Sequence, residues 1–205
     1  MEHALPVTWR RPEPAAARGA EPAAAAADAD DARAARRAEE AALVRAAQAG
    51  DRAAFGRLYE RYARVVHGLL LARVRAASAE DLVQDVFVQA LQRLADLRDP
   101  QAFPGWLAAI ARRRALDHHR RERPLDELPG DVPATPDGAE EAARVLSLLR
   151  TLPAAYRETL VLRLVEGLSG PEIAERTGLT EGSVRVNLHR GVRLLRERLG
   201  VEERG

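Results

Sequence analysis

The stretch from Leu168 to Leu199, LSGPEIAERTGLTEGSVRVNLHRGVRLLRERL, decides the fold of the C-terminal part of the chain. Ser169 is a favourable N-cap, Pro171 suits the first helical turn, and Glu172 completes a capping box. Gly178 stands where this first helix must stop, at a position that favours a left-handed backbone. The stretch therefore predicts a short capped helix followed by a tight turn.

The second helix of this stretch, capped by Thr180, has one apolar face and one cationic face. The apolar face carries Val184, Leu188, Gly191 and Leu195. The opposite face carries Arg185, Val186, His189, Arg190 and Arg193. A short helix of this kind after a tight turn is the form that enters a DNA major groove. The alternative is an ordinary helical hairpin with a solvated charged face.

Composition indicates an all-α protein without cysteine chemistry. The chain has 205 residues, enough for one or two small domains, and its formal net charge is +1. Ala, Leu, Arg and Glu dominate, and no alternating apolar pattern marks a strand. The absence of cysteine excludes disulfides, thiol catalysis and Cys-ligated zinc. No signal-peptide pattern or long apolar run occurs, so we expect a cytoplasmic protein without membrane insertion.

Changes in composition divide the chain into five segments. They are a disordered Ala/Pro-rich extension (1–39), a first helical domain (40–123), a flexible acidic linker (124–138), a second helical domain (139–200) and a tail (201–205). In the first domain we expect a helix that ends at Ala49-Gly50, two helices capped by Asp51 and Ser78, and a fourth helix after Asp99-Pro100. Because the linker is rich in proline and glycine and poor in apolar residues, we expect the two domains to move independently.

The densest basic segment lies at the end of the first domain, between Arg112 and Arg123. Phe103 and Trp106 precede it on the same expected helix. Aromatic and basic side chains together favour phosphate neutralisation and base stacking on an opened DNA strand. We expect Phe103 to lie in the core, whereas Trp106 fits either a core position or a DNA contact. Solvated arginines are the alternative interpretation.

The helix after Ser78 has an outer face of a different kind, formed by Asp81, Gln84, Asp85, Val88 and Gln92. This mixture of acidic, amide and apolar groups is typical of a protein-docking surface, with a solvated face as the alternative. Asp117-His118-His119 has the form of a metal-phosphoesterase signature, but no strand or further carboxylates accompany it. We therefore predict no catalytic residue, metal or cofactor.

Three of these motifs, taken in order, resemble an extracytoplasmic-function (ECF) sigma factor of the sigma-70 family, over about residues 41–200. AEDLVQDVFVQAL (Ala79–Leu91) resembles the region 2 helix that docks on the polymerase β′ clamp helices, which implies contacts by Asp81, Leu82, Gln84, Asp85 and Val88. FPGWLAAIARRRALDHHRR (Phe103–Arg121) resembles the segment that melts the −10 element, which implies contacts by Trp106, Arg112, Arg113, Arg114, Asp117 and Arg120. The stretch from Leu152 to Leu199 resembles region 4, which reads the −35 element, and implies contacts by Thr180, Ser183, Arg185, Val186, His189, Arg190 and Arg193.

The resemblance implies a transcription-initiation factor without chemistry of its own. Its partners would be core RNA polymerase (the β′ clamp helices and the β subunit), promoter DNA and an anti-sigma factor. In the family, the loop before the −10 helix holds an unpaired base, and here it maps to about Asp96–Ala102. Arg113 stands where members often have asparagine, and Arg185-Val186-Asn187 replaces a common lysine-serine-arginine run, so the promoter sequence does not carry over.

Two other classes of protein fit the same residues. One is a stand-alone helix-turn-helix regulator with a helical sensing domain, which would bind duplex DNA without polymerase. The other is a helical adaptor that binds only protein. Copurification with core polymerase followed by transcription from a promoter fragment separates the three.

Overall fold

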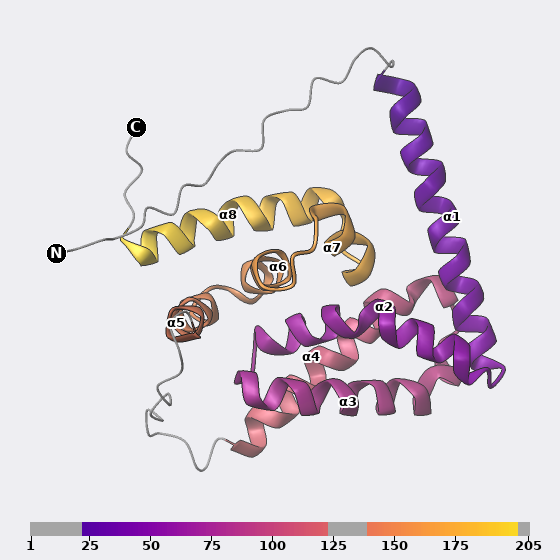
Figure 1. The fold of residues 1–205 in the computed structure, drawn as a ribbon, viewed down its shortest axis with the longest axis horizontal. Coiled ribbons are helices and arrows are strands. Elements are labelled where there is room, and N and C mark those ends of the chain that lie inside the picture. Colours follow the sequence, from indigo (N-terminus) through magenta and orange to yellow (C-terminus); the bar gives the residue numbers. More distant parts are fainter. Residues whose placement is uncertain (1–21, 123–138, 201–205) are drawn as a thin grey trace. The chain divides into compact units, whose positions relative to one another are not determined.

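The described part of the chain, residues 22–122 and 139–200 of a computed structural model, consists of helices joined by short turns, without a strand (Figure 1). The helices before the gap are α1 (Pro22–Gln48), α2 (Arg52–Leu71), α3 (Ala76–Arg93), the 3-10 turns η1 (Leu94–Asp96) and η2 (Pro100–Ala102), and α4 (Phe103–Glu122). Those after it are α5 (Ala139–Arg150), α6 (Ala154–Leu164), α7 (Gly170–Thr177) and α8 (Glu181–Leu199). The predicted all-α class is confirmed, and the predicted linker (124–138) lies outside the described residues.

Residues 1–21 of the N-terminal extension lie outside the described residues, and residues 22–39 are helical instead of disordered. Helix α1 begins at Pro22, well before the boundary expected near residue 40. Residues 22–39 are rich in alanine, which has the highest intrinsic helix propensity, so a helix can form there without a buried face. The chain separates into two compact units, residues 1–37 and 38–205, and the second unit begins close to the expected domain boundary.

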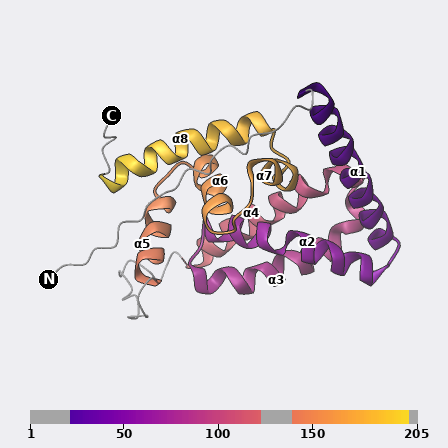
Figure 2. The same cartoon turned by 45° about the horizontal axis from the view of Figure 1, so that its top comes forward.

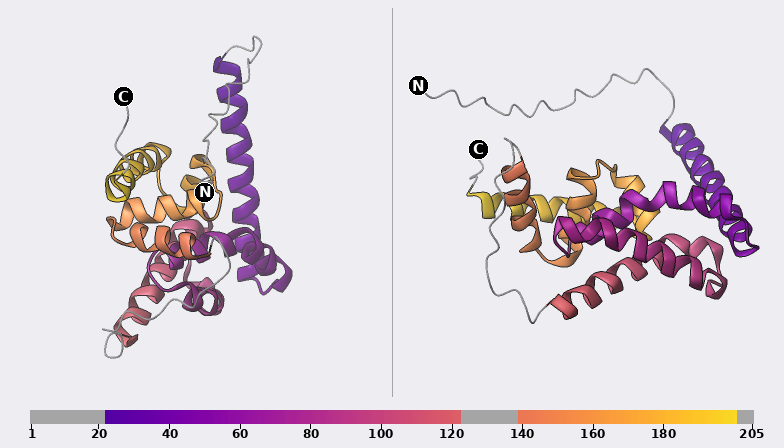
Figure 3. Two further views of the ribbon diagram at one scale, coloured as in Figure 1. Left: turned by 60° about the vertical axis from the view of Figure 1, so that its left-hand side comes forward. Right: turned by 60° about the horizontal axis from the view of Figure 1, so that its bottom comes forward.

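The first domain packs the end of α1 with α2, α3 and α4, which lie side by side (Figure 3). Its fully buried side chains include Val44, Leu58, Tyr62, Leu69, Phe103 and Leu107. The inner face of α3 (Val83, Val86, Phe87, Ala90) and Leu94, which follows the helix, are buried. The Tyr62 hydroxyl donates to the Glu40 carboxylate at 2.5 Å, and burial raises the pKa of both groups.

One of the two expected caps in the first domain is present. The Asp51 carboxylate accepts from the backbone N–H groups of Ala53 and Ala54, at 2.8 and 3.0 Å. The Ser78 cap is wrong, because α3 begins at Ala76 and the Ser78 N–H already bonds to the Arg75 carbonyl at 3.1 Å. Arg75 has the extended backbone of an N-cap residue, and the two alanines that follow fit a first turn as well as Ser78 does.

The second domain packs α5, α6 and α7 around α8. Its core includes Leu149, Leu160, Leu162, Ile173 and Val184. A side chain at Gly191 would lie 2.9 Å from Leu160 Cδ1, so the glycine lets α8 approach α6 closely.

Some large apolar side chains are not part of either core. Leu164 and Val165, at the end of α6, are 47% and 45% exposed. Leu116 on α4 is 49% exposed. The expected helices are therefore present, while some of their apolar residues face solvent.

The two domains share one hydrophobic cluster. Helix α6 packs on α2, and α7 packs on α4 (Figure 2). The interior of α2 has a glycine at the contact, because a Cβ at Gly68 would lie 2.7 Å from Leu162 Cδ2 and 2.9 Å from Glu166 Cγ. The Arg150 guanidinium adds a hydrogen bond to the Val74 carbonyl at 2.6 Å.

Candidate nucleic-acid interface

The α7-turn-α8 unit has the local geometry expected from its sequence. The Ser169 N–H donates to the Glu172 carboxylate at 2.9 Å, and the Glu172 N–H donates back to Ser169 Oγ at 3.3 Å. The Ser169 N–H lowers the pKa of the Glu172 carboxyl. Gly178 has φ +74°, and Thr180 Oγ1 accepts from the Ser183 N–H at 3.1 Å. The predicted capping box, turn glycine and second cap are all present.

Helix α8 presents one continuous exposed face. Val184 and Leu195 are buried on the opposite side. The exposed side chains are Thr180, Ser183, Arg185, Val186, His189, Arg190 and Arg193. Val186 is 44% exposed among these polar and basic side chains. All seven residues predicted to contact duplex DNA therefore lie together.

The predicted DNA residues of α4 divide between two faces. Trp106, Arg113 and Arg120 recur every seven residues, so they share one side of the helix. Arg113 and Arg120 are exposed, and the half-buried Trp106 packs on the buried Phe103 with a ring-centroid distance of 5.9 Å. Arg114 and Asp117 are half-buried. The expected core position of Phe103 is confirmed.

Arg112 lies on the other face of α4 and contacts the second domain. Its Nη2 and Nε lie 2.9 and 3.1 Å from Glu158 Oε2. Glu158 is only 6% exposed and also pairs with Arg73, from the turn after α2. The Arg112 guanidinium, which the sequence predicts to contact DNA phosphate, is thus paired with a carboxylate of the second domain.

The segment between α3 and α4 exposes polar side chains and is anchored to the core by buried leucines. Leu94 and Leu97 are 2% and 7% exposed, whereas Asp96, Arg98 and Gln101 face solvent. The Asp99 carboxylate caps η2 by accepting from the Gln101 N–H at 2.9 Å. This segment immediately precedes α4.

The outer face of α3 carries the predicted docking residues, with one exception. Asp81, Gln84, Asp85 and Val88 are exposed, and Val88 is 55% exposed. Leu82 is only 8% exposed, so its side chain belongs to the core rather than to the docking face. Leu91, 53% exposed and three residues after Val88, extends the apolar part of the face. Its helical spacing from Val88 was the signal that sequence reasoning missed.

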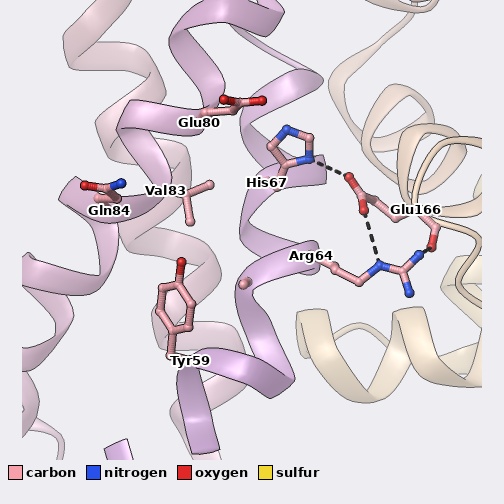
Figure 4. A pocket seen from close by; sticks show the side chains of 8 residues that line it. Tyr59, Arg64, His67, Glu80, Val83, Gln84 and Glu166 are labelled. Carbon is pink, nitrogen blue, oxygen red and sulfur yellow. Dashed lines mark hydrogen bonds and ion pairs between the residues drawn. The ribbon is translucent and has the colours of Figure 1, made fainter. Parts of the chain in front are cut away.

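A shallow pocket of about 380 Å³ lies beside this face, between α2, α3 and the segment after α6 (Figure 4). The side chains of His67 and Arg64 point from α2 toward Glu166. Gln84 and Glu80 of α3 also line the pocket. His67 Nδ1 lies 2.7 Å from Glu166 Oε1, and this hydrogen bond raises the pKa of the histidine. The pocket therefore joins the docking helix to a contact between the two domains.

Within residues 22–122 and 139–200, no group of three or more His, Asp or Glu side chains is placed to hold a metal, and Asp117-His118-His119 is no exception. None of the helices in these ranges is long and apolar enough to cross a membrane.

Comparison with known families matches both domains. The family model of sigma-70 region 2 matches residues 58–124, and that of sigma-70 region 4 matches residues 142–195. The chain belongs to the sigma-70 family. Its region 2 match spans the docking face and the aromatic-basic helix, and its region 4 match contains the helix-turn-helix.

The relatives of this sigma factor include ECF members. It is 36% identical over 183 residues to the ECF RNA polymerase sigma factor BldN of Streptomyces coelicolor, which covers 83% of this chain and 67% of BldN. It is 35% identical over 160 residues to the RNA polymerase sigma factor CarQ of Myxococcus xanthus (74% of this chain, 92% of CarQ). It is 35% identical over 175 residues to the ECF sigma factor SigD of Mycobacterium tuberculosis (77% and 82%).

Solved structures share the arrangement of helices. CnrH, solved in complex with the cytosolic domain of CnrY, superposes with a TM-score of 0.57 at 28% identity, covering 80% of this chain and 99% of CnrH. The sigma factor RpoE of Bartonella quintana, solved with the anti-sigma factor NepR, has the same fold, with a TM-score of 0.51 at 21% identity, over 73% of this chain and 98% of RpoE. The chain is thus an ECF-type sigma factor in both sequence and fold.

Proposed function

We propose that three separate surfaces of this sigma factor perform transcription initiation: α8 reads the −35 element, α4 with the segment before it captures the opened −10 element, and the outer face of α3 docks on core polymerase. The observation that carries the proposal is the continuous exposed face of α8, backed by a buried apolar face and fixed by two caps. The protein works by binding alone, because its task is to place polymerase on DNA and to hold a strand open.

The α8 face has the donors and the apolar contact needed to read base edges. Arg185 and Arg190 each suit a bidentate contact to guanine, and the Val186 side chain suits a thymine methyl group. The Thr180 and Ser183 hydroxyls lie 2.8 Å apart at the helix N-terminus, where such groups contact phosphate. Arg193, near the Glu197 carboxylate at 3.6 Å, lies farther along the helix and suits the DNA backbone.

The exposed side of α4 suits a melted strand. Trp106 offers an aromatic face, and Arg113 and Arg120 follow on the same side at successive positions for phosphates. Trapping an extruded base offsets the few kcal/mol that its unstacking costs. Arg112 can join this contact only when it leaves Glu158.

The α3 face is suited to a basic protein partner. Asp81, Gln84 and Asp85 supply acceptors around the exposed Val88 and Leu91, which is the composition of an interface with an apolar centre and a polar rim. We assign this face to the β′ clamp helices of core polymerase. Polymerase lies in the cytoplasm, so the protein acts there.

An anti-sigma factor is a further partner under this proposal. RpoE was solved with an anti-sigma factor and CnrH with the cytosolic domain of CnrY, and both share the fold of this chain. Such a partner would cover the docking face or the DNA faces and so hold the protein inactive.

Reconstitution with core polymerase tests the proposal. The wild-type protein should copurify with core enzyme and direct transcription from a promoter fragment. A protein that binds that fragment as a dimer without polymerase would instead be a stand-alone regulator. The double variant Asp81→Arg/Asp85→Arg should lose polymerase binding and keep its circular dichroism spectrum, whereas Glu60→Arg, an exposed change on α2, should keep both. Normal polymerase affinity of the double variant would remove α3 as the docking face.

The base-reading role of α8 needs its own variant. Arg185→Ala should weaken promoter binding by about 1–3 kcal/mol, and transcription with it. It should also relax the base preference at one position of the −35 element. Arg57→Ala, an exposed arginine outside the three surfaces, is the matched control. Equal loss on every −35 variant would show that Arg185 contacts phosphate.

A further inference from the structure

Gln48, the last residue of α1, joins that helix to the segment before α4. Its side-chain Nε2 donates to the Leu94 carbonyl at 3.0 Å and to the Leu97 carbonyl at 2.7 Å. A primary amide nitrogen carries two protons, so both are used here. The end of α1 is itself fixed, because Val44 and Ala47 are buried in the first domain. The amide therefore ties a rigid helix to a loop nearly fifty residues away.

The two carbonyls lie where the loop leaves the core. Leu94 opens η1 and Leu97 closes it, and both side chains are buried. The chain then exposes Arg98 and Asp99 before η2 begins. Gln48 holds the Leu97 backbone at one end of this short exposed stretch, and the Asp99 cap fixes the start of η2 at the other. The backbone of the stretch is therefore held at both ends.

We propose that Gln48 is a positioning residue for capture of the unpaired −10 base: it holds segment 96–102 in the conformation that receives the base, without touching DNA. The proposal rests on the proposed role of region 2 in opening the −10 element. A loop that becomes ordered only on binding loses conformational entropy, which reduces the net binding free energy. A loop that is already held in the bound conformation therefore binds more tightly. Gln48 supplies that order from outside the loop.

Two substitutions separate the hydrogen bonds from the packing. Gln48→Glu keeps the shape but replaces the donor nitrogen with a carboxylate oxygen that faces two carbonyl oxygens. Gln48→Met keeps the length and the apolar contacts of the side chain without any donor. Ala42→Glu, on the exposed side of α1, adds the same charge as Gln48→Glu away from the loop and serves as the control.

The test uses the full chain with core polymerase and a promoter fragment that the wild-type holoenzyme transcribes. Abasic sites are placed one at a time along the non-template −10 strand, and binding to the pre-opened fragment is measured. For the wild type, loss of the captured base should weaken binding strongly at one position. In Gln48→Glu and Gln48→Met this penalty should fall about tenfold, the size expected for two ordinary hydrogen bonds. The penalties at other positions and the polymerase affinity should not change, and Ala42→Glu should behave as wild type.

The outcomes distinguish this inference from the function on which it rests. If the wild type shows no base-specific position, capture by region 2 is wrong. If it shows one and both Gln48 variants keep the full penalty, Gln48 does not position the loop. A uniform loss at every position would mean that Gln48 only stabilises the domain, which also overturns the proposal. If Gln48→Glu melts at a lower temperature than the wild type, Gln48→Met decides.

Discussion

We expect the charged Glu158 carboxylate to hold the two domains together in the free protein. The carboxylate is 6% exposed and lies between Arg112 of α4 and Arg73 of the turn after α2. Removing one partner of a buried ion pair costs about 3–5 kcal/mol. The Arg112 and Arg73 side chains are 33% and 19% exposed, so they regain part of their hydration when Glu158 is neutral. For Glu158→Gln we therefore expect a loss of about 2 kcal/mol of contact energy, or roughly 30-fold in the ratio of closed to open molecules.

A distance measurement between two spin labels tests this expectation. The chain has no cysteine, so Gln92→Cys on α3 and Arg190→Cys on α8 label without further changes. The wild-type background should give one narrow distance, and Glu158→Gln should add a broad population. Glu197→Gln, which removes a 3.6 Å pair with Arg193 within α8, is the matched control and should leave the distance unchanged.

Two results would refute the reasoning. A broad distribution in the wild-type background would mean that the domains move independently, as the proline-rich linker predicts from sequence. A narrow distribution in Glu158→Gln would mean that apolar packing between α2 and α6 holds the domains without the ion pair.

Four further changes have defined outcomes. Arg113→Ala should weaken promoter binding on all sequences and lower the salt slope by about one unit, and an unchanged slope would show a solvated side chain. Deletion of residues 2–37, which precede the second compact unit, should leave melting temperature and polymerase affinity unchanged, and a clear drop in either would show that they dock. Ser169→Ala should cost about 1 kcal/mol in chemical denaturation through loss of the α7 cap; no change would mean that the capping box is not formed. The His67 hydrogen bond to Glu166 raises the histidine pKa above its ordinary value of 6.5, so its contribution to the contact is complete below pH 6.5 and is lost as pH rises through the raised pKa. The label distance should therefore broaden on alkalisation, and no longer do so in His67→Gln.

The features that sequence predicted correctly are those encoded within one or two helical turns. The capping box of Ser169 and Glu172 and the left-handed Gly178 involve residues at most a few positions apart, so their spacing determines their geometry. The exposed α8 face follows from helical periodicity in the same way. The Ser78 prediction failed because a favourable N-cap residue type is not required for a helix to begin: α3 begins after Arg75, which makes no side-chain cap bond.

The features that sequence did not predict depend on contacts between distant residues. Arg112 and Arg113 are adjacent and chemically identical, and only the position of Glu158 on another helix gives them different surroundings. Leu82 is grouped by the resemblance with four exposed docking residues, but its side chain is 8% exposed and lies in the core. Gln48 forms its two bonds across nearly fifty residues, which no periodicity reveals.

Gly68 is a residue whose type in the sequence nevertheless reflects the contact between the domains. A glycine in the interior of a helix is less favourable than alanine by about 1 kcal/mol, and α2 has no turn or kink at this position to require it. The cost is offset only where another element approaches the backbone, and here Leu162 of α6 does so. Gly105, at the start of α4, differs, because a Cβ there would meet no atom within 4 Å, although a Cβ at Gly178 would lie 3.2 Å from the Gly105 Cα. Gly68 is thus the position in region 2 where the contact with region 4 requires a glycine.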